Sequence, residues 1–174
     1  QAAIKYRGRG VVAVDLAGDE AKHPLSLFED FYARAKAAGL GTTAHAGEVP
    51  GSPDLELALR LGVDRIGHGG DLARKPELLR RVIARKIPIE VNLTSNIRTG
   101  AVVGYAEHPA AAWHRAGARI ALSTDDPGVF GIDLNGEYRA LAGQLAPDEL
   151  IAVVLSGIES LFLSAGEKAR LRDE

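Results

Sequence analysis

The chain has 174 residues, 46% of them hydrophobic and 25% charged, which is enough apolar material for one soluble globular domain. The formal net charge of -2, with both signs interspersed, gives no electrostatic footprint for nucleic acid or an anionic membrane, so we expect neither partner. There is no signal peptide and no apolar run near the ~20 residues that span a bilayer, so we expect a cytoplasmic location. Because cysteine is absent, any metal must be held by His, Asp or Glu.

Strands and helices alternate along most of the chain. Short apolar runs predict strands at 11–16, up to His45, and at 65–69, 87–93 and 119–122. Helical periodicity, with proline or acidic residues at the starts and glycine at several ends, predicts helices at 24–38, 53–61, 76–86 and 109–116. Two more helices, at 134–145 and 147–164, follow without a strand between them, and the charged end at 168–174 is expected to fray.

This alternation implies a parallel sheet with right-handed crossovers. The unusual polar residues follow the carboxyl ends of the strands: Asp15, His45, His68, Asn92 with Asn96, and the pair Asp125-Asp126. That rim carries the site in both an open doubly wound sheet and a (β/α)8 barrel. No glycine-rich phosphate loop follows any strand, which counts against a nucleotide-binding open sheet. Since five strands cannot close a barrel, a barrel requires three strands outside this sequence.

One rim therefore collects His45, Glu48, His68, Asp125 and Asp126, and these nitrogen and oxygen groups suit zinc. Zinc lowers the pKa of bound water to about 7, so such a site supplies hydroxide at neutral pH. Two neighbouring carboxylates oppose each other's ionisation unless a cation lies with them. The aspartate pair therefore favours a metal more strongly than either residue alone.

Most of these residues also have a purely structural interpretation. His45 would then be a core histidine with satisfied hydrogen bonds, Glu48 a cap for the following turn, and Asp15 a partner of strand-end amides. The run 125–127 would be a turn, and the run 94–96 would be loop capping groups. The sequence leaves these alternatives open.

His68 is harder to explain by structure alone. It lies between Gly67 and Gly69, which remove packing around it and imply that another group approaches the backbone closely. The remaining histidines lie beside or within predicted helices, and we expect them to be structural or at the surface, away from the rim: His23, His108 and His114.

Five motifs, in order, resemble those of the adenosine deaminase family. They are Asp15-Leu16-Ala17-Gly18-Asp19-Glu20, His45-Ala46-Gly47-Glu48, Arg65-Ile66-Gly67-His68-Gly69, Glu90 through the Thr94-Ser95-Asn96 run, and Ser123-Thr124-Asp125-Asp126-Pro127. The resemblance also includes the stretch 156–163 and covers nearly the whole chain. It implies an α/β fold, the (β/α)8 TIM-type barrel, of which residues 1–174 would supply strands 4 to 8 and the carboxyl-terminal helices of a single domain.

The resemblance further implies roles for the rim residues. His45 and Asp125 would bind Zn²⁺, and Glu48 would protonate the purine N1. His68 would orient the attacking hydroxide and take up or return its proton. Protonating N1 while hydroxide attacks C6 avoids a ring anion in the tetrahedral intermediate, which then loses ammonia.

The implied substrate is a small-molecule purine nucleoside. Asp126 would hydrogen-bond the purine N7, and the Gly18 backbone N–H would face N3. The leading hypothesis is hydrolysis of adenosine and 2'-deoxyadenosine to inosine-type products plus ammonia. The alternative within the same chemistry is another 6-aminopurine, adenine or 6-aminodeoxyfutalosine, because the ring contacts would be shared.

Two departures from the family pattern qualify this hypothesis. The family takes two further zinc ligands from a His-x-His after its first strand, and none of the five histidines here are so spaced. We therefore expect a carboxyl-terminal portion of a longer enzyme, with an amino-terminal segment of the same protein as its partner; the opening at Gln1 without methionine agrees. Asn92-Leu93 also stand where many members have Cys-Pro, which leaves the substrate open. The alternative of another class is a catalytically silent fragment that binds purines or a partner.

Overall fold

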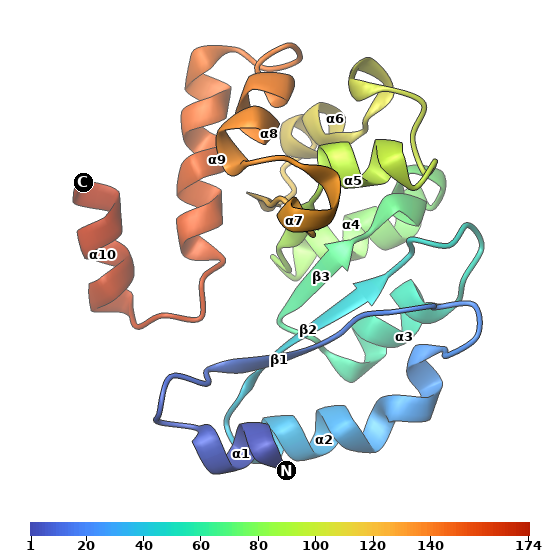
Figure 1. Ribbon diagram of the computed structural model, residues 1–174, viewed down its shortest axis with the longest axis vertical. Helices are drawn as coiled ribbons and strands as arrows, with labels where there is room; N and C mark the ends of the chain where they lie inside the picture. Colours follow the sequence, from blue (N-terminus) through green and yellow to red (C-terminus); the bar gives the residue numbers. More distant parts are fainter.

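The sheet contains five parallel strands whose spatial order is the order of the chain. The computed structural model describes residues 1–174 (Figure 1). The strands are β1 (Ala13–Leu16), β2 (Gly41–Ala46), β3 (Arg65–His68), β4 (Ile89–Val91) and β5 (Ile120–Leu122). The predicted parallel sheet is confirmed, although β4 is shorter at both ends than the predicted 87–93.

A helix lies on each connection between successive strands, as the alternation in the sequence predicted. These helices are α2 (Glu29–Ala37), α3 (Asp54–Leu61), α4 (Pro76–Ala84) and α6 (Ala110–Arg115). The predicted helix at 24–38 begins instead with a separate 3-10 turn, η1 (Leu25–Phe28). α3 ends where expected, because Gly62 takes the left-handed φ of 64° that stops a helix.

The connection after β4 differs from the prediction. The structural alternative treated residues 94–96 as loop capping groups, but they belong to α5 (Leu93–Arg98), which begins almost at the end of β4. α5 and the short α7 (Pro127–Phe130) both lie at the end of the sheet toward which β2 and β3 point (Figure 1). The helical turn brings Thr94, Ser95 and Asn96 into the buried interior, each 6% exposed or less.

The carboxyl-terminal part of the chain is entirely helical. α8 (Leu134–Leu141) and α9 (Pro147–Glu159) end earlier than predicted, and α10 (Ala165–Asp173) occupies the segment that was expected to fray. This helix was not predicted, and it begins with a capping box of Ser164 and Glu167, in which each side chain accepts a hydrogen bond from the other residue's backbone N–H. Three short elements complete the fold: α1 (Ala2–Tyr6), η2 (Gly70–Arg74) and η3 (Tyr105–Glu107).

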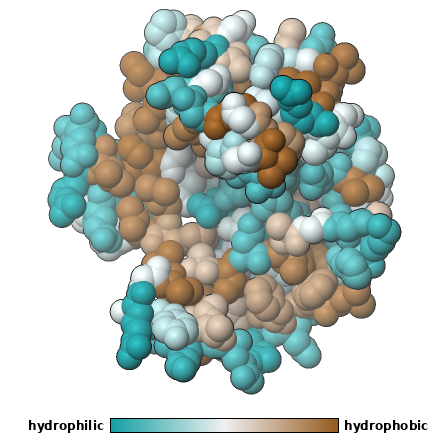
Figure 2. All heavy atoms as spheres, viewed as in Figure 1, coloured by the Kyte–Doolittle hydropathy of each residue, from teal (hydrophilic) through white to brown (hydrophobic).

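The core lies between the sheet and its helices. Sheet residues such as Ala44, Ile66 and Ile120 are fully buried, in one cluster with Leu55 of α3 and Val153 of α9. β1 and β5 are the two edges of the sheet, and apolar side chains remain exposed on α9, where they form a hydrophobic band in Figure 2. No helix is both long and apolar enough to cross a membrane.

The register of the strands aligns their carboxyl ends on one side of the sheet. Ala46 of β2 pairs with His68 of β3, and His45 pairs with Gly67, which in turn pairs with Glu90 of β4. Parallel strands aligned in this way, each followed by a helix, with neighbours in chain order, form part of a (β/α)8 barrel. The carboxyl ends therefore form one continuous rim.

Candidate active site

Three side chains of the predicted site meet at this rim. His45 of β2, His68 of β3 and Asp125 after β5 have ligand atoms within 4.8 Å of one another. His45 Nε2 lies 4.0 Å from Asp125 Oδ1, and His68 Nε2 lies 3.7 Å from Asp125 Oδ2. His68 and Asp125 also have left-handed backbone conformations, with φ of 60° and 57°, which non-glycine residues adopt rarely and often at functional sites.

The spacing and chemistry of these groups fit a zinc ion. Zinc binds imidazole nitrogen and carboxylate oxygen at about 2.0–2.2 Å, so two ligands of one ion lie at most about 4.4 Å apart. The His45–Asp125 and His68–Asp125 distances meet that limit, yet both are too long for direct hydrogen bonds. These nitrogen and oxygen atoms therefore surround a common centre, at distances from one another that a zinc ion bound between them would require.

His45 is oriented by Asp15. The Nδ1 atom of His45 lies 3.1 Å from Asp15 Oδ2, which leaves Nε2 directed toward Asp125. Burial lowers the pKa of His45, but the hydrogen bond and negative charge of Asp15, helped by Glu90 and Asp125, outweigh it and raise that pKa above its ordinary value. A carboxylate that binds the second ring nitrogen is the usual companion of a metal-ligating histidine. Asp15 therefore contacts a site residue and not the strand-end amides of the structural alternative.

Gly67 makes room for the His45 ring. A Cβ atom at this position would lie 2.9–3.1 Å from three atoms of the imidazole, so the ring would have to shift. On the far side of Gly67, Glu90 forms an ion pair with Arg65. Burial raises the pKa of Glu90, although the positive charge of Arg65 acts in the opposite direction. Glu90 is, after Asp15, a second carboxyl group whose charge affects the pKa of His45. Gly67, which precedes His68 in the sequence, therefore leaves space for the ring of His45 on the adjacent strand β2.

Glu48 reaches the site from the loop after β2. Its Oε2 atom lies 3.9 Å from His68 Nε2. The loop is held by Glu20, whose carboxylate accepts hydrogen bonds from the backbone N–H groups of Gly47, Glu48 and Val49 at 2.9, 3.0 and 3.0 Å. Sequence reasoning missed this role of Glu20, because partners 27 to 29 residues away leave no local pattern.

α5 supplies the groups behind the site. Ser95 Oγ–H donates to Asp125 Oδ2 at 2.7 Å, and the Asn96 amide lies 2.9 Å from His68 Nδ1. Asn92, at the start of this helix, lies 3.3 Å from the same His68 nitrogen. Ser95 and Asn96 are therefore contacts of site residues, and their interpretation as loop caps is wrong.

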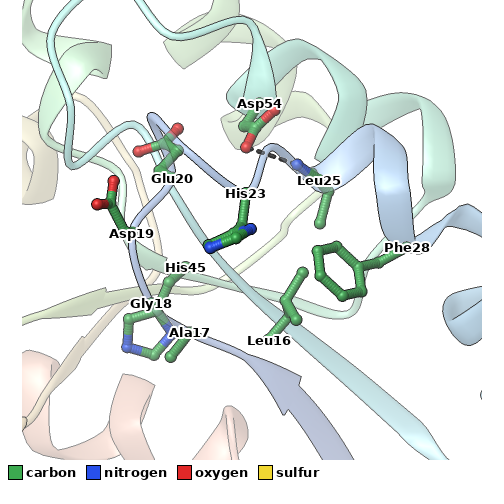
Figure 3. A pocket seen from close by; sticks show the side chains of 10 residues that line it. All are labelled: Leu16, Ala17, Gly18, Asp19, Glu20, His23, Leu25, Phe28, His45 and Asp54. Carbon is green, nitrogen blue, oxygen red and sulfur yellow. Dashed lines mark hydrogen bonds between the residues drawn. The ribbon is translucent and has the colours of Figure 1, made fainter.

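Gly18 and His45 line a cavity of about 160 Å³ that opens beside the site. Gly18 has a φ of +138°, which L side chains rarely adopt, and its backbone borders open space. Figure 3 shows the ring of His23 among the lining side chains. The expectation that His23 lies away from the rim is wrong, because it lies on the loop after β1 before the helix begins. His108 is buried, but it is connected to the rim, because its Nε2 atom lies 3.0 Å from the Asn96 amide that contacts His68.

Asp126 does not belong to the group of His45, His68 and Asp125 that could hold a metal ion. Its side chain is exposed, and its backbone carbonyl accepts the first hydrogen bonds of α7, from Val129 and Phe130. Of the two adjacent aspartates, only Asp125 places its carboxylate with the two histidines. The side chains of Asp125 and Asp126 lie in different surroundings because Asp125 takes the left-handed conformation and α7 starts directly after Asp126.

Comparison with known proteins identifies the family. The family model described as "Adenosine deaminase" matches residues 1–174, the whole chain. This chain belongs to the adenosine deaminase family. It is 44% identical over 168 residues to the adenosine deaminase of Yersinia pseudotuberculosis, an alignment that covers 95% of this chain and 50% of that protein. The chain spans about half the length of the curated relatives that it matches.

Solved structures of related deaminases share the fold. The adenine deaminase from Arthrobacter aurescens superposes with a TM-score of 0.88 and 31% identity, over 99% of this chain and 55% of that chain. The N6-mAMP deaminase of Arabidopsis gives a TM-score of 0.90 and 32% identity, over 98% and 51%. A Burkholderia amidohydrolase with bound Zn gives a TM-score of 0.85 and 28% identity, over 99% and 50%. The five-stranded sheet of this adenosine deaminase family member is therefore part of a TIM-type barrel.

Proposed function

We propose that the protein to which this chain belongs hydrolyses the 6-amino group of adenosine and 2'-deoxyadenosine, releasing ammonia. The observation that carries the proposal is the convergence of His45, His68 and Asp125 at one rim, with Glu48 3.9 Å from His68, in a member of this family. The identity of 44% to an adenosine deaminase favours this substrate.

In this proposal His45 and Asp125 hold a zinc ion. Asp15 keeps Nε2 of His45 directed toward Asp125, and Ser95 holds the Asp125 carboxylate through its second oxygen. Bound zinc would lower the pKa of a coordinated water to about 7 and so make hydroxide available at neutral pH.

The remaining site residues act on the purine. Glu48 donates a proton to N1, which lets C6 accept a new bond to oxygen without placing negative charge on the ring. The C6–N6 bond then breaks: the proton of the added hydroxyl group passes to the amino group, which leaves as ammonia, and C6 keeps the oxygen as a carbonyl. The Glu20 carboxylate keeps Glu48 in place through three backbone hydrogen bonds. Asp126, which is exposed at the start of α7, would reach N7, and the Gly18 N–H beside the cavity would face N3.

We further propose that an amino-terminal segment of the same protein completes the site. Catalytic zinc takes at least three protein ligands plus water, and in this proposal His45 and Asp125 supply only two of them. The open edges at β1 and β5, and the half-length match to curated relatives, support this proposal. Mass spectrometry with metal analysis tests it: full activity with stoichiometric zinc in a protein of 18.4 kDa would contradict it.

The activity is tested by following the loss of absorbance near the adenosine maximum, with and without a chelator. We expect turnover that the chelator abolishes and zinc restores. Absence of ammonia release from any 6-aminopurine would refute the proposal. Adenine, 6-aminodeoxyfutalosine and N6-methyl-AMP are assayed in parallel, because solved relatives include an adenine deaminase and an N6-mAMP deaminase. A higher kcat/KM for one of these would reassign the substrate but keep the chemistry.

A further inference from the structure

A chain of hydrogen bonds runs from a backbone amide to the catalytic histidine. The Ala110 N–H donates to His108 Nδ1 at 3.2 Å. His108 Nε2 lies 3.0 Å from one terminal atom of the Asn96 amide, and the other terminal atom lies 2.9 Å from His68 Nδ1. All four residues are at most 3% exposed, so water does not compete for these bonds.

The proton positions in this chain follow from the first bond. Ala110 is the first residue of α6, and its backbone N–H can only donate, so Nδ1 of His108 carries no proton. Burial lowers the pKa of His108 to about 4, so the ring is neutral at neutral pH. A neutral imidazole keeps one proton, which must therefore be on Nε2, directed at Asn96.

The orientation of the Asn96 amide follows in turn. If its N–H group faced His108, that ring would accept at both nitrogens, which a neutral imidazole cannot do. As drawn, Asn96 Nδ2 faces His108 and Oδ1 faces His68, but the two orientations exchange atoms of nearly equal size. We therefore assign the amide oxygen to His108 Nε2–H and the amide N–H to His68.

We propose that Asn96 and His108 are positioning residues that hold His68 in the tautomer with its proton on Nε2. With the Asn96 N–H facing Nδ1, His68 presents an N–H group between the carboxylates of Asp125 and Glu48, at 3.7 and 3.9 Å. An oxygen atom bound in that space receives a hydrogen bond from His68.

This inference rests on the proposed function and sharpens it. A protonated Nε2 cannot bind zinc, so His45 and Asp125 are metal ligands and His68 is not, although all three lie together. Nor can Nε2 take a proton from the attacking water. His68 orients the nucleophile as a donor, which replaces the proton exchange implied by family resemblance, and proton transfer falls to the neighbouring carboxylates.

The direct test needs no substitution at the site. Long-range ¹H–¹⁵N correlation spectra of the zinc-loaded protein, labelled with ¹⁵N-histidine, report which ring nitrogen of each imidazole carries the proton. We expect Nε2–H for both His68 and His108. His114→Gln, on α6, removes one set of signals and serves as the assignment control. A proton on Nδ1 of His68 would overturn the inference.

Two variants test the consequence. Asn96→Asp offers oxygen to both rings, so it should move the His68 proton to Nδ1 and lower kcat about 100-fold while KM changes less than about threefold. His108→Gln keeps an N–H donor toward Asn96 and should keep kcat within about threefold, whereas His108→Leu should resemble Asn96→Asp. Wild-type kcat and the Nε2–H tautomer in folded Asn96→Asp would overturn the inference.

The outcomes separate the two proposals. If the wild-type protein deaminates no 6-aminopurine, the proposed function fails, but the spectra still decide the tautomer of His68. If it deaminates adenosine with a proton on Nδ1 of His68, only the positioning role of Asn96 and His108 fails.

Discussion

Replacing Glu20 with glutamine should destabilise the loop that carries Glu48. The carboxylate is 8% exposed and accepts one N–H at Oε1 and two at Oε2. Glutamine keeps one acceptor oxygen and places an NH₂ group against the remaining backbone N–H. One hydrogen bond to a charged acceptor, worth about 1.5–3 kcal/mol, is lost, and the other two become weaker neutral bonds. Reduced desolvation of the side chain offsets part of this, so we expect the free energy of unfolding to fall by about 3 kcal/mol.

Urea denaturation followed by circular dichroism measures this change. The matched control is Glu56→Gln on α3, where the carboxylate is 53% exposed and pairs only with Arg81, so the expected loss is below about 1 kcal/mol. We also expect kcat/KM to fall at least about tenfold in Glu20→Gln, because Glu48 loses its fixed position. Equal stability losses in the two variants would show that the three bonds to Glu20 do not hold this loop.

Three further predictions concern the metal, the proton donor and pH. Glu48→Gln should retain zinc by metal analysis but lose nearly all turnover, since the shape is kept and the proton is lost; substantial activity would exclude Glu48 as the donor. Asp125→Ala should bind zinc at least about tenfold more weakly, and unchanged zinc content would show that the ligand assignment is wrong. Arg115 donates two hydrogen bonds to Glu149, which together with the Ala146 N–H lower the pKa of Glu149 from 4.5 to about 2. Stabilisation from a lowered carboxyl pKa is complete above pH 4.5 and is lost as the pH falls toward 2. Denaturation curves should therefore show Arg115→Gln to be most destabilising at pH 7 and least near pH 2; a constant difference would contradict this.

Much of the site could be predicted because its residues follow strands. His45, His68 and Asp125 are far apart in sequence, but each follows an apolar run, and parallel strands place their carboxyl ends at one edge. Register then sets the separations, as the pairing of Ala46 with His68 shows. The rim could therefore be predicted from the sequence pattern alone.

Other features depended on signals that were weak or misleading. Ser164 and Glu167 have the spacing of a capping box, so α10 could have been predicted, but the charged composition of 168–174 suggested fraying. α5 was harder to foresee, because Thr94, Ser95 and Asn96 favour caps and turns. Tertiary contacts override that preference: their side chains hydrogen-bond Glu137, Asp125 and His68.

The sequence by itself determined the parallel sheet, the rim and the family, because hydrophobic periodicity and strand-end motifs are local properties of the chain. Only the tertiary structure decided which groups support the rim. Glu20 acts on a loop 27 to 29 residues away, and His68 contacts Asn96, which in turn contacts His108, both from the segment after β4. Hydrogen bonds need donors and acceptors within about 3 Å, and packing alone brings such distant residues that close.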